Sequence, residues 1–323
     1  MHTPRSAPTV SVVVCAYTMA RWGLLGRAVA SIGAQTSPAL EVLVVVDHCP
    51  ELLVRAQELP GVRVMANLGT VGLSGARNTG VAAARGEVVA FLDDDAAAAP
   101  DWLERLVHPY DDPRVVGVGG HVVPEWEGGK PAWFPHEFDW VVGCSYVGQP
   151  TVTCAVRNPI GANMSFRREA LTAVGGFSAD VGRVGARPLG CEETELSIRV
   201  ARRDPTTTIL LEPRAVVRHH VPGDRSRWGY FWRRCWAEGL SKASVSRLTD
   251  PRSALASERS YALRTLPRGA ARGLADAVRR RESGGAARAL AIGAGLTITT
   301  AGYAVGKTGR SAVPHPNPRG ELA

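Results

Sequence analysis

The sequence lacks the features that mark a secreted or a zinc-binding protein. It has six cysteines but no CxxC pair and no regular cysteine spacing, so neither a disulfide framework nor a zinc site is indicated. The N-terminal segment "MHTPRSAPTVSVVVCAY" has only a short apolar run and is typical of a first core strand rather than of a signal peptide. We also find no internal repeats. These absences predict a protein of the reducing cytosol.

The sequence has little that could cross a membrane and, over most of its length, no excess of either charge. Residues 1–250 carry as many basic as acidic side chains, whereas residues 251–323 hold eleven arginines and one lysine against four acids and account for the net charge of +8. The uncharged segment 290–306 falls just short of a membrane span, and three interpretations stay open: it spans a membrane, lies on one, or packs on the rest of the protein. The basic tail predicts an anionic membrane surface as partner, and no nucleic acid is expected because no nucleic-acid-binding module is recognisable.

What is present predicts a folded α/β protein. The chain is 45% hydrophobic and 21% charged, as in soluble globular proteins, and its length allows one large domain with a smaller appendage. Strand-like segments rich in valine, such as "TVSVVVCAY" and "LEVLVVVD", alternate with segments of helical periodicity. This alternation predicts right-handed βαβ units and a Rossmann-like, mostly parallel central sheet flanked by helices, with a helical C-terminal extension.

The expected organisation has four parts. Residues 1–8 are predicted to be a disordered N-terminus and 311–323 a disordered tail. Residues 9–225 form the predicted catalytic domain, divided into a nucleotide-binding half (9–100) and a less regular acceptor half (101–225). Residues 226–310 form the basic and aromatic helical extension.

Three consecutive carboxylates, Asp93 to Asp95, end the buried strand "VVAFLD". A helix N-cap would account for one of them but not for three. Mg²⁺ or Mn²⁺ accounts for the cluster better, because these ions take one or two carboxylates and complete their coordination with water and substrate phosphates. A haloacid-dehalogenase-type phosphatase also has Asp-x-Asp after a strand, but near its first strand. A transferase that uses a nucleotide-diphosphate sugar is therefore the better interpretation.

Five segments in order resemble one enzyme family over residues 9–239: "SVVVCAY", "VLVVVD", "GLSGARNTGVAAARGEVVAFLDDD", "GANMSFRREALTAVGGF" and "CEETELSIR". They are similar to the inverting family 2 glycosyltransferases with a GT-A fold, in particular the bacterial type. The resemblance implies a hexosyltransferase-like enzyme that moves a sugar from a UDP-, GDP- or dTDP-linked donor to an acceptor hydroxyl. It would act in cell-envelope or other glycoconjugate synthesis.

The resemblance also implies roles for residues near the donor. The implied donor-binding residues are Ala16, Tyr17, Asp47, Arg77, Asn78, Asp93 and Asp94. The implied metal ligands are Asp95, as the principal one, Asp93 and His219, although a single histidine such as His219 is more often structural. Both Asp47 and Arg77 also have a structural alternative. Asp47 could cap a helix, and Arg77 could form an ion pair.

The catalytic base is expected among two adjacent glutamates. Where the family usually has Glu-Asp before a helix, this chain has Glu192 and Glu193. Glu193 occupies the implied position of the base that removes the proton of the acceptor hydroxyl, and Glu192 stays the alternative. Both acids would also favour the start of a helix without any catalytic role.

The acceptor site is the least patterned part of the sequence. The resemblance implies that Gly161, Asn163 and Trp228 contact the acceptor, which would be a sugar, a lipid-linked or a small molecule. Asp224, Arg227 and Trp228 match only in part the Gln-x-x-Arg-Trp motif of processive synthases, so a single transfer is expected. A processive synthase and a catalytically degenerate, membrane-associated binding module are the alternatives. The enzyme would be cytoplasmic or peripheral on the cytoplasmic face of the membrane.

Overall fold

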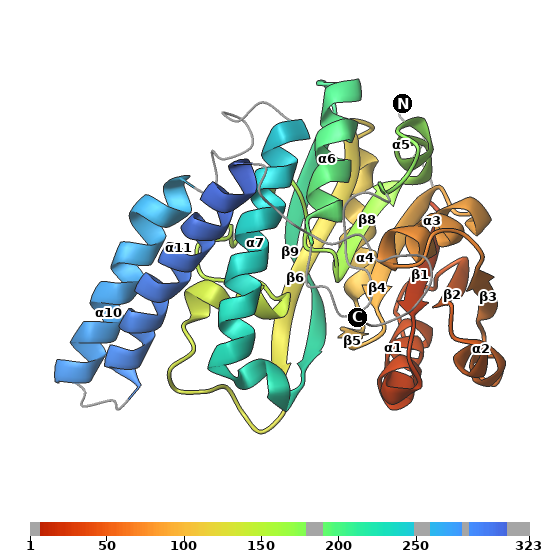
Figure 1. Ribbon diagram of the computed structural model, residues 1–323. Coiled ribbons are helices and arrows are strands. Elements are labelled where there is room, and N and C mark those ends of the chain that lie inside the picture. Colours follow the sequence, from red (N-terminus) through yellow and green to blue (C-terminus); the bar gives the residue numbers. More distant parts are fainter. Residues whose placement is uncertain (1–6, 179–189, 249–258, 280–283, 309–323) are drawn as a thin grey trace.

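The computed structural model describes residues 7–178, 190–248, 259–279 and 284–308. The expected disordered tail at 311–323 and most of the expected disordered N-terminus lie outside these residues. The described chain forms one curled sheet of nine strands with helices on both faces and a layer of C-terminal helices at one side (Figure 1). The predicted α/β fold with a helical extension is confirmed.

The first part of the sheet is parallel. Its strands follow the order β3-β2-β1-β4, and α1, α2 and α3 connect them. The strands β1, β2 and β4 are mostly buried, which explains their valine-rich runs, since each fully buried valine stabilises the fold by roughly 1.5–3 kcal/mol, whereas the edge strand β3 is only partly buried. The elements are β1 (Val10–Ala16), α1 (Trp22–Gly33), β2 (Glu41–Asp47), α2 (Pro50–Ala56), β3 (Arg63–Asn67), α3 (Leu73–Ala83) and β4 (Val88–Asp93).

The second part of the sheet is mixed, so the sheet as a whole is less parallel than expected. The strand order continues from β4 as β8-β6-β9-β5, with β7 also paired to β9, and only the β6–β9 pairing here is parallel. The elements are β5 (Ala96–Ala98), α4 (Trp102–Val107), β6 (Val115–Trp126), β7 (Cys154–Ala155), β8 (Asn163–Arg167), α5 (Arg168–Ala173), α6 (Glu192–Arg203) and β9 (Thr208–Val221).

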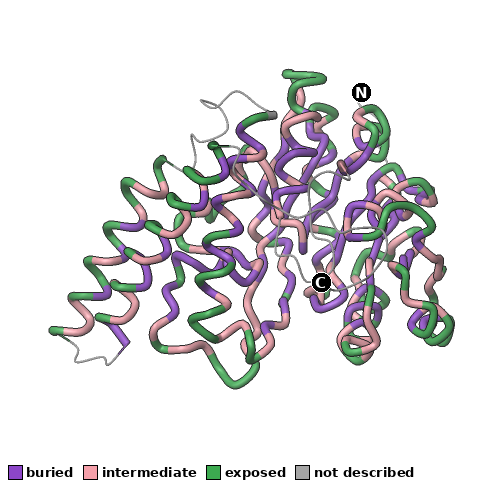
Figure 2. The backbone as a smooth tube through the Cα atoms, in the orientation of Figure 1, coloured by how far each residue is buried: buried purple, intermediate pink, exposed green. Residues whose placement is uncertain are grey.

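The C-terminal helices pack side by side on the side of the molecule that is farthest from β3 (Figure 1). They are α7 (Trp228–Leu248), the π-helical turn η5 (Tyr261–Thr265), α10 (Leu266–Arg279) and α11 (Gly285–Lys307). The helix α11 lies between α7 and α10. The strands in the middle of the molecule are mostly buried, whereas α10 carries exposed residues along its whole length (Figure 2).

Close approach between the backbones of these helices depends on glycine. A Cβ atom at Gly302 of α11 would lie 2.5 Å from the carbonyl oxygen of Trp236, and a Cβ at Gly239 of α7 would lie 2.3 Å from that of Thr299. The second helix pair is equally close, since a Cβ at Gly285 would lie 2.5 Å from the Gly273 oxygen. The extension is therefore packed tightly on itself.

Candidate active site

The acids at the ends of β2 and β4 lie at the same edge of the sheet, on either side of β1. Asp47 ends β2 and Asp93 ends β4, and Cys15 of β1 is in register with Asp93. The Asp47 carboxylate accepts hydrogen bonds from Asn67 Nδ2 (2.6 Å) and from the backbone N–H of Gly72 (2.9 Å). Asp47 therefore holds the loop that leads into α3, and its predicted contact with the nucleotide base stays a prediction.

A positive side chain that the sequence did not reveal compensates the Asp triplet. Nη1 of Arg21 lies 2.8 Å from Oδ1 of Asp94 and 3.0 Å from Oδ2 of Asp95. Both acids are buried, and Oδ2 of Asp94 has no hydrogen-bond partner among the described residues. Burial and the neighbouring Asp95 charge raise the pKa of Asp94 to about 7 despite Arg21. Asp94 and Asp95 form the turn that follows β4, and both side chains reach the same guanidinium nitrogen of Arg21.

The second cation at the triplet is His219. Its Nε2 lies 3.1 Å from Oδ1 of Asp95, and its Nδ1 lies 3.7 Å from Sγ of Cys144. The short strand β5 causes this contact, since Ala96 is in antiparallel register with His219 of β9. Burial opposes the positive charge of His219, but Asp95 and Cys144 outweigh burial and raise its pKa to about 10. Burial likewise opposes the charge of Asp95, and His219 and Arg21 nevertheless lower its pKa.

Three of these side chains are arranged as metal ligands could be. One carboxylate oxygen from each of Asp93 and Asp95 and one ring nitrogen of His219 all lie within 4.8 Å of one another. Carboxylate oxygens suit Mg²⁺ and Mn²⁺, and His219 would join them as a ligand in its neutral form, after losing the proton that it shares with Asp95. The donor set that the sequence predicted is thus brought together in space.

Arg77 of α3 lies at the centre of the site and is buried. It donates from Nη1 to Oε1 of Glu192 (3.1 Å) and from Nη2 to the Gly161 carbonyl (3.1 Å), and Nη2 lies 3.6 Å from Oδ1 of Asp93. Its guanidinium also packs on the ring of Phe177, 5.3 Å from the centroid. Burial opposes its charge, but Glu192 and Asp93 raise the Arg77 pKa, so the side chain stays cationic.

The two adjacent glutamates at the start of α6 have different surroundings. Glu192 is buried and paired with Arg77, and its Oε2 has no partner among the described residues. Glu193 is half-buried and lines the cavity described below. Burial and the Glu192 charge raise the Glu193 pKa to about 8. A carboxylate with such a pKa is a strong proton acceptor once it is ionised.

A cavity of about 700 Å³ joins these groups to the C-terminal helices. Asp93, Arg77 and both glutamates line it. Side chains of α7, η5 and α11 line it too, namely Tyr230, Arg234, Glu238, Lys242, Tyr261, Thr299 and Tyr303. Of this contribution by the extension, the sequence suggested only the start of α7, through the partial motif that ends at Trp228.

Several predicted site residues lie elsewhere. Asn163 is fully buried in the sheet, where it accepts from Trp102 Nε1 (2.8 Å) and donates to the carbonyls of His121 and Ala215. Its amide is used within the core, and its predicted contact with the acceptor stays a prediction. Trp228 stacks on Trp133 at 3.9 Å and lies outside the described residues that line the cavity.

Four further donor and acceptor predictions can be located. Gly161 lines the cavity and is bound to Arg77. Asn78 exchanges hydrogen bonds with the backbone of Phe177, so its amide positions that segment, and donor contact by Asn78 stays a prediction. Ala16 is buried at the end of β1, and the neighbouring Tyr17 is 47% exposed, with Arg21 over its ring.

Comparisons with known proteins agree with this geometry. Residues 11–175 match Glycosyl transferase family 2. The chain is 37% identical over 244 residues to the glucosyl-dolichyl phosphate glucuronosyltransferase of Haloferax volcanii. This alignment covers 74% of this chain and 78% of that protein. It is 42% identical over 108 residues to the succinoglycan biosynthesis protein ExoO of Rhizobium meliloti, over 32% of this chain and 30% of that protein. Relatives from an archaeon and from a bacterium both match, so the bacterial type stays a prediction.

A solved structure is similar over nearly the whole chain. The mannosyltransferase PcManGT from Pyrobaculum calidifontis, in complex with GDP-Man and Mn²⁺, aligns with a TM-score of 0.61 and 25% identity. The alignment covers 94% of this chain and 88% of that one. The chain therefore belongs to glycosyl transferase family 2 and is a glycosyltransferase.

Proposed function

We propose that the protein transfers a sugar from a nucleotide-diphosphate sugar to an acceptor hydroxyl by a metal-dependent, inverting single displacement. The observation that carries the proposal is the joint placement of Asp93, Arg77 and Glu193 along one cavity. This arrangement offers a cation site and a base within one space, which an inverting displacement requires at opposite sides of the reacting carbon.

Asp93, Asp95 and His219 would hold the divalent cation. Bound Mg²⁺ or Mn²⁺ would neutralise charge on the diphosphate leaving group. The related PcManGT was solved with a nucleotide sugar and Mn²⁺, which supports a donor of that class. Asp47 and Asn67 shape the loop before α3, beside which the nucleotide would lie, with Ala16, Tyr17 and Asn78 as further candidate contacts.

Glu193 would remove the proton of the attacking hydroxyl. Glu192 is held by Arg77, and its charge raises the proton affinity of Glu193. Arg77 in turn contacts both Asp93 and Glu192, so it would keep the metal side and the base side of the site in fixed relation. Glu192 acts in this scheme as a positioning residue.

The acceptor would be lipid-linked. The cavity continues between α7, η5 and α11, so the acceptor half proposed at 101–225 would be completed by the extension at 226–310. The Haloferax relative is named for a lipid phosphate sugar, which supports the same acceptor class. The protein would then work at the cytoplasmic face of a membrane, in cell-envelope or other glycoconjugate synthesis.

The test is binding of UDP-, GDP- and dTDP-sugars by calorimetry, with Mn²⁺, with Mg²⁺ and without metal, for the wild type and Asp95→Ala. We expect metal-dependent binding of one nucleotide class by the wild type and its loss in the variant. Absence of binding to every donor would overturn the proposal. Donor binding without turnover on any acceptor would favour the degenerate binding module, and repeated additions to one acceptor would favour a processive synthase.

A further inference from the structure

One side of η5 and α10 presents a stripe of exposed uncharged residues. Leu263, Pro267, Ala271, Leu274 and Val278 follow one another at spacings of four, four, three and four residues and are all exposed. Such spacings place side chains on one face of a helix. The three large apolar side chains are highly exposed: Leu263 by 75%, Leu274 by 55% and Val278 by 79%. An apolar helix face this continuous and this exposed indicates a contact surface.

A row of arginines borders this stripe. Arg264, Arg268, Arg272 and Arg279 recur at spacings of four, four and seven residues, on the helix side next to the stripe, and all are exposed. The single acid of the helix, Asp276, is half-buried and bound to Arg288 of α11 at 3.0 Å. The exposed charges that flank the stripe are therefore all positive. A basic row beside an apolar stripe matches the interface of an anionic bilayer.

We propose that α10 is the element by which the protein docks on an anionic membrane. The stripe from Leu263 to Val278 would enter the boundary between headgroups and acyl chains, and the arginines would bind lipid phosphates. Membrane contact is thus placed on α10. From the sequence, the uncharged segment 290–306 was the candidate for spanning a membrane or lying on one.

The packing of α11 supports this assignment. By length and composition alone α11 could cross a membrane. However, it packs on α7 through Gly302 and on α10 through Gly285, with backbones in near contact at both places. A helix held on two sides by soluble, charged neighbours would have to detach from both in order to span a bilayer. We therefore assign α11 to packing within the extension.

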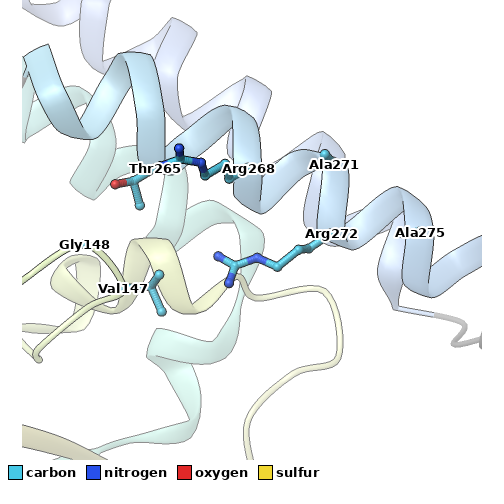
Figure 3. A pocket seen from close by; sticks show the side chains of 7 residues that line it. All are labelled: Val147, Gly148, Thr265, Arg268, Ala271, Arg272 and Ala275. Atoms are coloured by element: carbon cyan, nitrogen blue, oxygen red, sulfur yellow. The ribbon is translucent and has the colours of Figure 1, made fainter.

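A hollow beside the arginine row suits a phosphate group. It measures about 620 Å³ and lies between α10 and the segment Val147–Gly148. The side chains of Arg268 and Arg272 extend along it, with Thr265 at one end (Figure 3). Arg272 also bonds to Glu137 at 2.8 Å, which fixes its direction. Two guanidinium groups on one hollow provide the paired donors that phosphate oxygens prefer.

The hollow adjoins the catalytic cavity. Gly148 and Thr265 line both spaces. Docking through α10 would thus bring the acceptor end of the cavity to the membrane surface, where a lipid-linked acceptor could enter. This consequence rests on the proposed function, whereas membrane binding itself can be measured without any transfer.

The experiment is flotation with phosphatidylcholine vesicles that contain, or lack, phosphatidylglycerol. We expect the wild type to float only with the anionic vesicles. The variant Leu263→Ser/Leu274→Ser/Val278→Ser should lower the partition coefficient by about tenfold or more, because apolar area is removed from the contact. The variant Arg264→Gln/Arg268→Gln/Arg279→Gln should lower it by about fivefold for each arginine.

The control is Leu40→Ser/Val54→Ser, two residues of the catalytic domain that are 49% and 74% exposed and lie outside the proposed donor site. It should float like the wild type. Circular dichroism and metal-dependent nucleotide binding show whether each variant is folded, and they separate failure of this proposal from failure of the proposed function.

Three outcomes would overturn the proposal. The stripe variant could float as well as the wild type. The stripe could instead be covered by a second copy of the chain, in which case light scattering would show a wild-type dimer that becomes monomeric in the stripe variant. Finally, the arginine variant could lose binding to an RNA or DNA oligonucleotide while flotation of all variants stays equal, which would assign the arginines to nucleic acid.

Discussion

Nη1 of Arg77 lies 3.1 Å from Oε1 of Glu192, and this buried ion pair distinguishes two glutamates that are adjacent in the sequence. Glu192 is bound to the arginine, while Glu193 faces the cavity and is made more basic by the Glu192 charge. The pair also connects α3 to α6.

Replacing Glu193 by Gln should lower kcat by about 10²-fold or more, since the amide cannot accept the acceptor proton. Metal-dependent donor binding should persist, because Glu193 is not one of the candidate metal ligands. Initial rates at saturating donor and calorimetry of donor binding measure the two effects. Unchanged transfer in Glu193→Gln would disprove the assignment of the base and return Glu192 as the candidate.

The transfer rate should rise with pH up to about 8. Burial and Glu192 raise the Glu193 pKa to about 8, and only the ionised form accepts a proton, so activity is low below this pH and reaches a plateau above it. Below the pKa the slope should be about tenfold per pH unit. Rates between pH 6 and 9.5 test this. In Glu193→Gln the residual rate should lose the rise, and a flat wild-type profile contradicts the prediction.

Replacing His219 by Ala should weaken Mn²⁺-dependent donor binding by at least about tenfold, since one of three candidate ligands is lost. The neighbouring His220→Ala is the matched control, because the contact of residue 220 with Asp95 is made by its backbone N–H and survives the change. Titration with Mn²⁺ at fixed nucleotide sugar compares them. Equal affinities of the two variants would remove His219 from the metal site.

Replacing Arg77 by Met should lower the free energy of unfolding by about 3–5 kcal/mol, because Glu192 would be left buried without a partner. Urea unfolding measures the change. The control is Arg114→Met, which removes an exposed ion pair with Asp112 and should cause no measurable change. A similar stability of both variants would mean that the buried pair is not a stabilising contact.

Replacing Gly302 by Ala should lower the free energy of unfolding by about 1–3 kcal/mol, because the new Cβ would lie 2.5 Å from the Trp236 oxygen and push α11 from α7. Gly293 of the same helix has open space around a Cβ, so Gly293→Ala should be neutral or stabilising by up to about 1 kcal/mol. Thermal and urea unfolding compare the pair, and equal effects would refute the close packing of α11.

Much of the fold could be predicted because its strands and helices have patterns that can be recognised in short segments of the sequence. The valine-rich runs of β1 and β2 and the helical periodicity between them predicted the parallel half of the sheet, and this half was confirmed. The mixed half was less predictable. Its strands pair across long separations, and the short strand Ala96–Ala98 looks in sequence like part of a loop before α4.

Site residues that belong to sequence motifs were predicted. Site residues that are defined only by contacts between distant segments were missed. The acids Asp93 and Asp95 were predicted from the end of a strand, and His219, which lies within β9, was predicted from the resemblance to the family. Arg21 was missed, because it is 73 residues from Asp94 and no local pattern distinguishes it from other arginines. The burial of Asn163 was also not foreseen, because a polar residue within a motif gives no sign of whether its side chain faces a cavity or the core.

The sequence by itself determined the strand and helix types, the acidic end of β4 and the two glutamates at the start of α6, because periodicity and residue chemistry are local properties. Only the tertiary structure decided which glutamate is paired, which cations face the triplet and that the C-terminal helices complete the cavity. These features arise from contacts between distant segments, such as Arg77 and Glu192 at a separation of 115 residues. Packing and register of the whole fold bring such residues together, and no single segment specifies them.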